Sequence, residues 1–250
     1  IARSDVNMVM TVNPQTKTIL LTSIPRDSYV TLHSFGAEDK LTHSGIYGVE
    51  ETVDTVEDWL DYDMNYYIKA NFSMLVDIVD AIDGVDVYSD FEFKSSVADF
   101  YYNEGENHLS GMAALYFARE RKAFEDEDIE RGRNQQKVLK AMINKTTQSK
   151  VILTKYTQLL DAVEDEMQTN MSEKDISSLV KMQINDMGKW TINTISITGT
   201  DAYAPTYSMG SQELAVVIPD ETSVEAAKQA IHDTMYPAYT KEKKNKSKTK

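Results

Sequence analysis

The six arginines of this chain are confined to three short stretches of the sequence. An arginine side chain is planar and permanently charged, and it grips a carboxylate or phosphate through two parallel hydrogen bonds. The twenty lysines are instead scattered along the chain and gathered at its C-terminus. This partition predicts one arginine-lined anion site built from distant segments, with structural pairing to nearby carboxylates as the alternative for any single arginine. The arginines are Arg3, Arg26, Arg119, Arg121, Arg131 and Arg133.

Helical spacing sorts the arginines of the third stretch. If a helix begins near Asp128, Arg131 and Gln135 follow at i+3 and i+7 and share one face with it. Arg133 then points to the other side, so we leave it out of the candidate site. The N-terminus of such a helix would also favour a bound anion. A solvated, charged helix start is the alternative interpretation.

The remaining candidate site residues lie in segments that are expected to be extended or to end a strand. Arg119 and Arg121 are two residues apart and share a face only if that stretch is extended. Pro25 fixes a corner after an apolar run, so Arg26 would project from a strand end, where ligands often bind in sheet proteins. Asp5, beside the first arginine, is a natural Mg²⁺ ligand next to a phosphate site, or else a salt-bridge partner.

The charge balance excludes one class of partner. The net charge is −14, and residues 241–250 hold six lysines and one glutamate, which leaves about −19 for the other 240 residues. Binding of nucleic acid is dominated by neutralisation of its phosphates, so an acidic body argues against it. A small anionic ligand in a local arginine pocket remains compatible with this charge.

Other chemistries find little support in the sequence. The chain has no cysteine, which removes disulfides, thiolate metal sites and cysteine nucleophiles. It has no apolar run of about 18 residues, no glycine-rich phosphate loop and no Gly-x-Ser-x-Gly motif. The histidines lack metal-ligand spacing, and we expect each at the surface or in a loop. They are His33, His43, His108 and His232.

Hydrophobic periodicity predicts alternating strands and helices. A hairpin loop over residues 13–17 joins the first two strands, and residues 91–107 are expected to form an irregular, exposed excursion. The expected strands are 6–12, 18–24, 28–33, 66–70, 85–88, 192–197 and 214–218. The expected helices are 45–60, 72–82, 110–117, 129–145, 151–166, 172–187 and 223–235.

This order of elements indicates an α/β fold in which a central sheet is packed between helices as an α-β-α sandwich. We expect a single domain over residues 1–238 and a disordered, lysine-rich tail over 239–250. The chain begins at Ile1 without a methionine and close to a strand. We therefore expect an upstream part, with any membrane anchor, to lie outside this chain.

Taken together, these motifs resemble the LytR–CpsA–Psr family. The resemblance runs from about residue 3 to residue 145 with the motifs in order, and residues 150–240 match only loosely. Each motif alone is weak, and their combination is specific. The matching segments are Arg3-Ser4-Asp5, Asn13-Pro14, Ser23-Ile24-Pro25-Arg26-Asp27, the runs Val79 to Val87 and Leu109 to Arg121, and Asp128 with Arg131, Gln135 and Gln136.

The resemblance implies a phosphotransferase on the extracytoplasmic face of the membrane of Gram-positive-type cells. Such proteins have an N-terminal membrane anchor and an α/β sandwich with a groove for a lipid tail. They move a glycopolymer, either wall teichoic acid or capsular polysaccharide, from a polyprenyl (undecaprenyl) pyrophosphate carrier to peptidoglycan, and a phosphodiester forms. Arginine and Mg²⁺ suit phosphoryl transfer, which requires positioning and neutralisation of the phosphate oxygens.

Family roles carry over by position to matching residues. The resemblance implies a Mg²⁺ ligand at Asp5, and it places Arg3 and Asp128 in the surrounding polar shell. The implied pyrophosphate ligands are Arg3, Arg26, Arg119, Arg121, Arg131 and Gln135. The implied catalytic residues are Arg26, Arg119, Arg121, Asp128 and Arg131.

The chain departs from the family pattern in two places. The family has an earlier strand ending in an aspartate that shares the metal, and that strand would precede residue 1. The family also often has an arginine directly before its glutamine pair, where this chain has Asn134, so the role of that arginine is either lost or taken by Arg133. Two other functions use the same arginines. One is a non-catalytic module that binds polyprenyl pyrophosphate, and the other is a pyrophosphatase in which water replaces the sugar hydroxyl.

Overall fold

The computed structural model of the protein describes residues 4–125, 127–148, 154–155, 158–159, 167–186 and 188–237. Its internal contacts divide the chain into two compact units. Unit 1 comprises residues 1–64 and 191–250, and unit 2 comprises residues 65–190. The expected tail over 239–250 and most of the expected helix over 151–166 lie outside the described residues.

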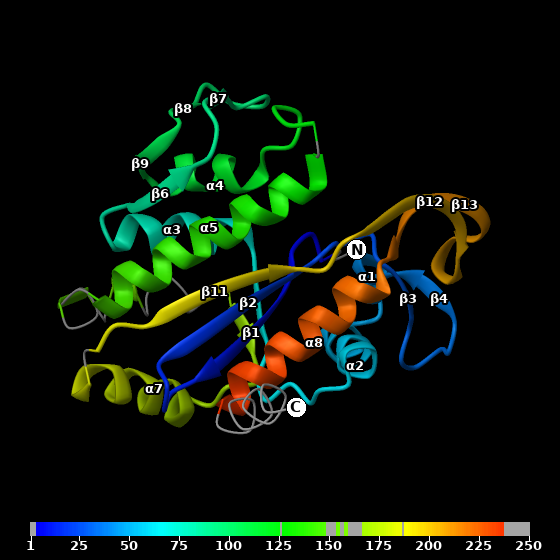
Figure 1. Ribbon diagram of the computed structural model, residues 1–250, viewed down its shortest axis with the longest axis horizontal. Helices are drawn as coiled ribbons and strands as arrows, with labels where there is room; N and C mark the ends of the chain where they lie inside the picture. Colours follow the sequence, from blue (N-terminus) through cyan, green and yellow to red (C-terminus); the bar gives the residue numbers. More distant parts are fainter. Residues whose placement is uncertain are drawn as a thin grey trace, which may run out of the picture. The chain divides into compact units, whose positions relative to one another are not determined.

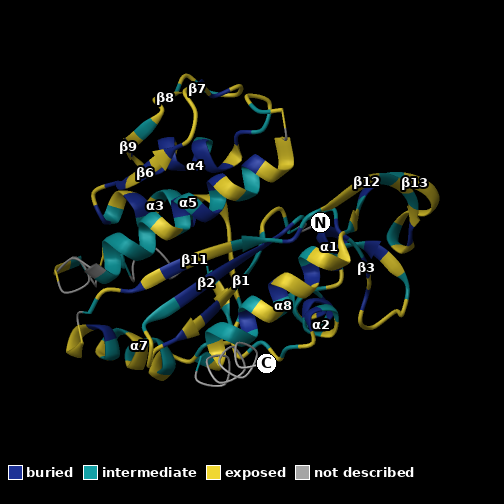
Figure 2. Ribbon diagram, viewed as in Figure 1, coloured by how far each residue is buried: buried dark blue, intermediate teal, exposed yellow. Residues whose placement is uncertain are grey.

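Unit 1 is built on a three-stranded sheet of order β1-β2-β11 (Figure 1). β1 (Asn7–Asn13) and β2 (Thr18–Ile24) form the antiparallel hairpin predicted from the loop over residues 13–17, with Asn7 opposite Ile24. β11 (Thr191–Ser196) lies parallel to β2 on its other edge. β2 is buried along nearly its whole length, as expected of a central strand (Figure 2).

Helix α8 (Glu221–Met235) packs along this sheet and contacts all three strands. It begins at Asp220, whose side chain accepts hydrogen bonds from two backbone N–H groups of the first turn. Its buried face joins Leu20 and Ile24 of β2 in one apolar core, to which α2 (Val49–Leu60) also contributes. The helix face in that core consists of Val224, Ala227 and Ile231.

The rest of unit 1 consists of short elements and a long hairpin. β3 (Tyr29–Thr31) and β4 (Glu38–Lys40) pair, and α1 (Leu41–Ser44) follows directly. β12 (Gly199–Thr206) and β13 (Gly210–Pro219) form a hairpin closed by the 3-10 turn η1 (Tyr207–Met209). The sequence predicted only residues 214–218 of this hairpin, because most of its residues are exposed and carry no apolar alternation.

Unit 2 has its own apolar core, which is formed by a two-stranded sheet and three helices. β6 (Val85–Ser89) pairs with β9 (Gly105–Leu109), and α3 (Phe72–Ala81), α4 (Gly111–Arg119) and α5 (Glu127–Gln148) pack with them. The buried members of this core include Val79, Val85, Phe117 and Val138. The remaining elements of unit 2 are β5 (Ile68–Ala70), β7 (Phe93–Lys94), β8 (Tyr101–Tyr102), β10 (Met167–Thr169) and α7 (Glu173–Asn185).

Gly111 explains part of the motif that precedes Arg119. A side chain at this position would overlap the carbonyl oxygen of Val76 in α3, so only glycine allows α4 to begin there. The Gly111 N–H also donates to Asp80 Oδ1 at 2.7 Å. This close approach fixes the start of α4. It therefore also fixes the position of Arg119 at the end of the helix.

The expectation for residues 91–107 was wrong in part. The segment contains β7, β8 and part of β9, and its residues Phe93 and Tyr102 belong to the core. The rings of Phe93 and Tyr102 pack at a tilt with centroids 4.7 Å apart, and the Tyr102 hydroxyl donates to the Ala113 carbonyl at 2.8 Å. Strands of two residues are too short to show a hydrophobic alternation. The sequence therefore did not indicate that these two rings point into the core.

Candidate functional site

The predicted site residues fall into two groups, one on each compact unit. Asp5 and Arg26 belong to unit 1, and the arginines of the third stretch belong to unit 2 together with Asp128 and Gln135. Arg3 lies outside the described residues. That one anion draws on arginines of both groups stays a prediction.

In unit 1, Arg26 sits in a tight turn directly after β2. The Ser28 N–H donates to the Pro25 carbonyl at 3.1 Å, and the Thr42 N–H donates to the Arg26 carbonyl at 2.8 Å. These bonds fix the backbone of the turn, in agreement with the corner that was predicted at Pro25. The Arg26 side chain therefore leaves from a rigid support at the end of a buried strand.

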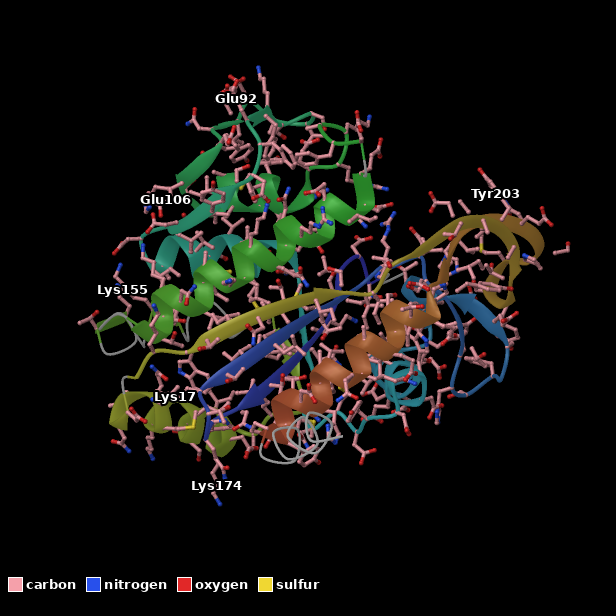
Figure 3. All side chains as sticks on the ribbon, in the orientation of Figure 1. Lys17, Glu92, Glu106, Lys155, Lys174 and Tyr203 are labelled. Atoms are coloured by element: carbon pink, nitrogen blue, oxygen red, sulfur yellow. The ribbon has the colours of Figure 1, made fainter. Side chains whose placement is uncertain are left out.

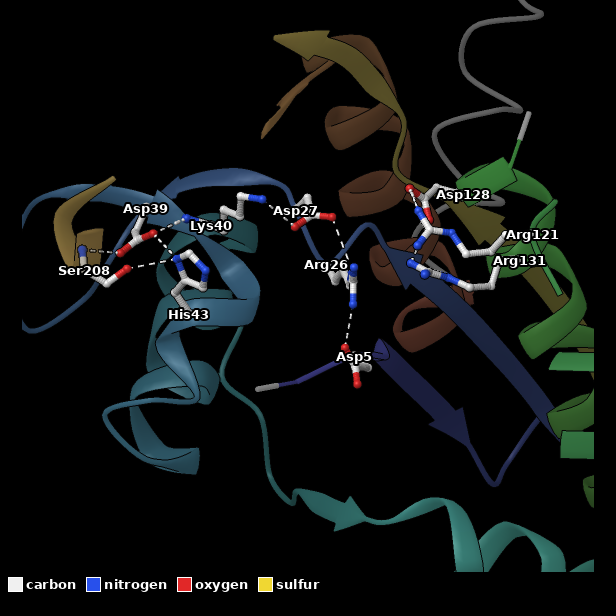
Figure 4. A network of polar contacts seen from close by, with 10 residues as sticks. All are labelled: Asp5, Arg26, Asp27, Asp39, Lys40, His43, Arg121, Asp128, Arg131 and Ser208. Atoms are coloured by element: carbon white, nitrogen blue, oxygen red, sulfur yellow. Dashed lines mark hydrogen bonds and ion pairs between the residues drawn. The ribbon is translucent and has the colours of Figure 1, made fainter. Parts of the chain in front are cut away.

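Carboxylates orient the Arg26 guanidinium (Figure 4). Nη1 donates to Asp5 Oδ1 at 2.6 Å, and Nε donates to Asp27 Oδ2 at 3.3 Å. Asp27 in turn accepts a hydrogen bond from Lys40 Nζ at 3.1 Å. Asp5 thus pairs with Arg26. A salt bridge of this kind was the alternative to a Mg²⁺ ligand in the sequence analysis. Lys40 joins this group through a contact that spans 13 residues, and no sequence motif pointed to it.

In unit 2, Asp128 holds two guanidinium groups side by side (Figure 4). Its Oδ2 accepts from Arg121 Nη2 at 2.7 Å, and its Oδ1 pairs with Arg131 Nη2 at 2.9 Å. The pair of Arg121 and Arg131 is called the arginine pair below. Two positive charges against one carboxylate leave a net positive charge, which suits a further anion.

Helix α5 presents the rest of this group as its spacing predicted. It begins at Glu127, so Asp128 and Arg131 lie in its first turns, and Gln135 follows one turn later in a half-buried position. Arg133 forms its ion pair with Glu130 and is not part of the Asp128 contacts. Its exclusion from the candidate site agrees with this geometry.

Arg119 lies at the end of α4, and Glu120 is extended at φ −63° and ψ 138°. The Arg119 guanidinium lies over the ring of Phe72, 4.8 Å from its centroid, a cation–π contact that no sequence motif indicated. Glu120 is buried and accepts hydrogen bonds from the N–H groups of Ser96, Arg121 and Ala123. Glu120 thereby fixes the turn that carries Arg121.

The pKa of Glu120 reflects these contacts. Burial raises the pKa of the carboxyl, but hydrogen bonds from Ser96, from the Arg121 N–H and from Ser95 outweigh it, so the pKa lies below its ordinary value. Glu120 is therefore a carboxylate at neutral pH. The fixed negative charge supports the backbone that places Arg121.

Two buried donors of unit 2 fit an acceptor such as a phosphate oxygen. Arg121 Nε and Asn134 Nδ2 are buried and have no hydrogen-bond partner within the described part of the chain. A buried donor without a partner costs about 1–3 kcal/mol, so such atoms point to an ion or water that completes them. Asn134 occupies the position where the family often has an arginine, and it still offers a donor there.

His43 contradicts its expected surface position. It is buried at 2% exposure, and its Nδ1 lies 2.7 Å from Asp39 Oδ1. Ser208 of η1 completes the contact, with Oγ 2.9 Å from the same nitrogen and its N–H donating to Asp39 Oδ2 at 2.8 Å. Ser208 is 165 positions from His43 in the sequence, so spacing could not have shown the group.

Metal ligands are sparse. Among the described residues, no group of three or more histidine, cysteine, aspartate or glutamate side chains could hold a metal ion. In the same residues, no helix is both long and apolar enough to cross a membrane. A Mg²⁺ ion held by a single carboxylate would depend on phosphate oxygens for its other ligands.

Comparison with known families decides the identity. The family model described as the LytR_cpsA_psr family matches residues 1–230. The chain belongs to the LytR–CpsA–Psr family. The match continues well beyond residue 145, so it includes the region where the sequence motifs are loose, together with β11, β12, β13 and α8.

Individual members of the LytR–CpsA–Psr family agree. A polyisoprenyl-teichoic acid–peptidoglycan teichoic acid transferase, TagU of Bacillus licheniformis, is 38% identical over 175 residues, which cover 70% of this chain and 56% of the relative. The chain thus spans little more than half the length of that relative. The crystal structure of TagV from B. subtilis has a TM-score of 0.75 at 30% identity and covers 94% of this chain and 90% of TagV.

The structure of TagT bound to LI-WTA has a TM-score of 0.73 at 29% identity, covering 93% of this chain and 85% of TagT. These likenesses confirm the mixed α/β fold of the LytR–CpsA–Psr family that the order of elements predicted.

Proposed function

We propose that this chain is a phosphotransferase that moves a glycopolymer, wall teichoic acid above all, from a polyprenyl pyrophosphate carrier to peptidoglycan. The arginine pair on Asp128 is the observation that carries the proposal. It is a fixed cationic group with a buried unpartnered donor, in a chain whose relatives are named for teichoic acid transfer. Capsular polysaccharide is the other polymer class that the same chemistry serves.

The reaction is a displacement at phosphorus. The oxygen of a peptidoglycan hydroxyl bonds to the phosphorus that carries the glycopolymer, and the bond from that phosphorus to the bridging oxygen breaks. The polyprenyl phosphate leaves with the bridging oxygen, and the hydroxyl releases its proton. The arginines neutralise charge on the phosphate oxygens and stabilise the transition state, because guanidinium groups match phosphate geometry.

The arrangement within each unit supports that role. Arg26 is held by Asp5 and Asp27, and the arginine pair is held by Asp128, so neither group must reorganise when charge develops. Pre-oriented donors of this kind stabilise a transition state more than mobile ones do.

Mg²⁺ is part of the proposal, with Asp5 as its protein ligand. Asp5 is about half exposed and lies beside Arg26, so a phosphate oxygen that approaches the arginine would also come near this carboxylate. One carboxylate with substrate phosphates is a common Mg²⁺ environment. The ion would add neutralising charge on the phosphate oxygens.

The substrates place this activity at the extracytoplasmic face of the cell membrane. A polyprenyl carrier is embedded in lipid, and peptidoglycan lies outside the membrane. A protein that joins the two works at that boundary.

The test is detection of the joined product. The protein is incubated with a polyprenyl-pyrophosphate oligosaccharide, Mg²⁺ and peptidoglycan fragments, and mass spectrometry seeks a phosphodiester-linked product. We expect product that disappears with EDTA and with Arg119→Ala. Release of polyprenyl phosphate without joined product would replace the proposal by a pyrophosphatase, and bound but unchanged lipid would replace it by a binding module.

A further inference from the structure

Three aromatic rings from separate segments meet on the surface of unit 1. Phe35 lies in the turn between β3 and β4, Tyr47 follows α1, and Tyr207 begins η1. The ring centroid of Phe35 is 4.5 Å from that of Tyr47 and 4.8 Å from that of Tyr207. The two tyrosine rings are 6.3 Å apart. These three residues are called the aromatic platform.

The aromatic platform is exposed. Phe35, Tyr47 and Tyr207 show 38%, 40% and 49% of their surface to solvent, and neighbouring Met209 shows 42%. Each of these three residues buries a little more than half of its surface, and the remainder is open to contact a ligand. A contiguous apolar surface that stays open is typical of a binding site.

Buried polar residues also hold the aromatic platform in a fixed position. Ser208, next to Tyr207, is fixed by the buried Asp39 and His43 through the contacts described above (Figure 4). The Tyr29 hydroxyl donates to the Pro205 carbonyl at 2.7 Å and fixes the same hairpin. A surface whose rings are already in place loses little conformational entropy when a ligand binds.

A chain of polar contacts within unit 1 leads from the aromatic platform to Arg26. The Lys40 N–H donates to Asp39 Oδ1 at 2.7 Å, and Lys40 Nζ reaches Asp27, which holds Arg26 Nε. The support of the platform and the support of Arg26 are therefore one continuous network (Figure 4). A ligand on the platform is held by the same scaffold as the arginine proposed to bind the donor phosphate.

The charges around the rings select the ligand. Burial raises the pKa of Tyr47, and the charges of Asp39 and Glu51 raise it further, so the hydroxyl stays neutral and can donate a hydrogen bond. Carboxylates near the rings repel a polyanion such as the phosphate-rich donor polymer. The C–H groups on one face of an uncharged sugar ring complement the electron-rich face of an aromatic ring.

We infer that the aromatic platform binds the sugar backbone of the acceptor, a peptidoglycan glycan strand, and presents its hydroxyl for transfer. The inference rests on the proposed function, because that function supplies the glycan acceptor. It adds a specificity surface made of Phe35, Tyr47 and Tyr207. Sugar rings stack on the exposed aromatic faces, and the tyrosine hydroxyls hydrogen-bond to sugar oxygens.

The binding test uses oligosaccharides of N-acetylglucosamine, the uncharged sugar of the peptidoglycan backbone, titrated into the protein by isothermal calorimetry. We expect Tyr47→Ala and Tyr207→Ala to weaken binding about tenfold or more, because each removes a stacking ring. Tyr207→Phe keeps the ring and should retain most of the affinity, which separates stacking from loss of folding. Tyr203→Ala is the matched control, since Tyr203 lies on the same hairpin and is 75% exposed (Figure 3). Its affinity should stay within about twofold of the wild type.

A transfer assay separates this inference from the proposed function. We expect Tyr47→Ala to raise KM for the acceptor glycan and to leave KM for the polyprenyl-linked donor unchanged. Glycan binding by a protein that makes no joined product would uphold the platform and overturn the proposed function. Transfer with an unchanged acceptor KM would overturn the platform alone. Self-association of the wild type that Tyr207→Ala abolishes, seen by sedimentation, would also overturn it.

Discussion

Asp128 illustrates what a single carboxylate can do at the residue scale. It contacts Arg131 from one turn earlier in α5 and Arg121 from the segment before the helix. Two like charges would otherwise repel each other, and the shared carboxylate reduces that repulsion while it fixes both guanidinium groups. Its contribution to transfer is therefore the orientation of the arginine pair.

Asp128→Asn tests this orientation. The variant removes the negative charge that holds both guanidinium groups, and hydrogen bonds to charged groups contribute about 1.5–3 kcal/mol each. We expect transfer to fall about tenfold or more, with little change in melting temperature because the contacts are partly exposed. Glu127→Gln, the exposed neighbour in the same turn, is the control and should keep normal transfer. Equal rates in the two variants would contradict the role of Asp128.

Glu120 gives a prediction for stability against pH. Its folded pKa lies below the ordinary value of 4.5, so its contribution is fully present above about pH 4.5 and is lost as the pH falls through the folded pKa. Glu120→Gln should cost about 1–3 kcal/mol of unfolding free energy at pH 7. The variant should also lose less stability than the wild type on acidification, as urea unfolding at several pH values would show.

The exposed Glu125→Gln in the same segment should change stability by no more than about 0.5 kcal/mol. If Glu120→Gln and the wild type lost the same stability between pH 7 and pH 3, the buried carboxylate would not be the group that titrates.

At the scale of elements, the pair β7 and β8 shows why the region before α4 is ordered. Phe93 contacts Tyr102, Phe117 and Phe124, with ring centroids 4.7, 5.5 and 4.9 Å apart. These contacts join the short strands to α4 and to the turn after it. The segment that the sequence predicted to be irregular thus supports the turn that carries the arginines.

Phe93→Ala should destabilise unit 2 by about 3–5 kcal/mol, because it removes a buried ring from the centre of an aromatic cluster. Hydrogen exchange of the α4 amides would report the change within that unit. Phe91→Ala is the matched control, since Phe91 is 51% exposed, and it should cost no more than about 1 kcal/mol. Similar effects of the two substitutions would contradict the assignment of Phe93 to the core.

At the scale of the whole molecule, the sequence predicted elements with strong periodicity and residues with local spacing. The hairpin of β1 and β2, the helices α3, α5 and α8, and the Asp128–Arg131 contact all follow from patterns within about ten residues. Contacts between distant segments were missed, among them Arg119 over Phe72 and Ser208 on Asp39. Such contacts depend on tertiary packing, which a single sequence does not encode locally.

The most direct test of the central claim is the rate of glycopolymer transfer in Arg26→Ala and Arg131→Ala, one variant for each unit, with Arg133→Ala as the control. Phosphoryl transfer depends on charge neutralisation, so both arginines should be needed. We predict a loss of about a hundredfold or more in each of the first two and about twofold or less in Arg133→Ala. Near-normal transfer in either Arg26→Ala or Arg131→Ala, or a collapse in Arg133→Ala, would contradict the account.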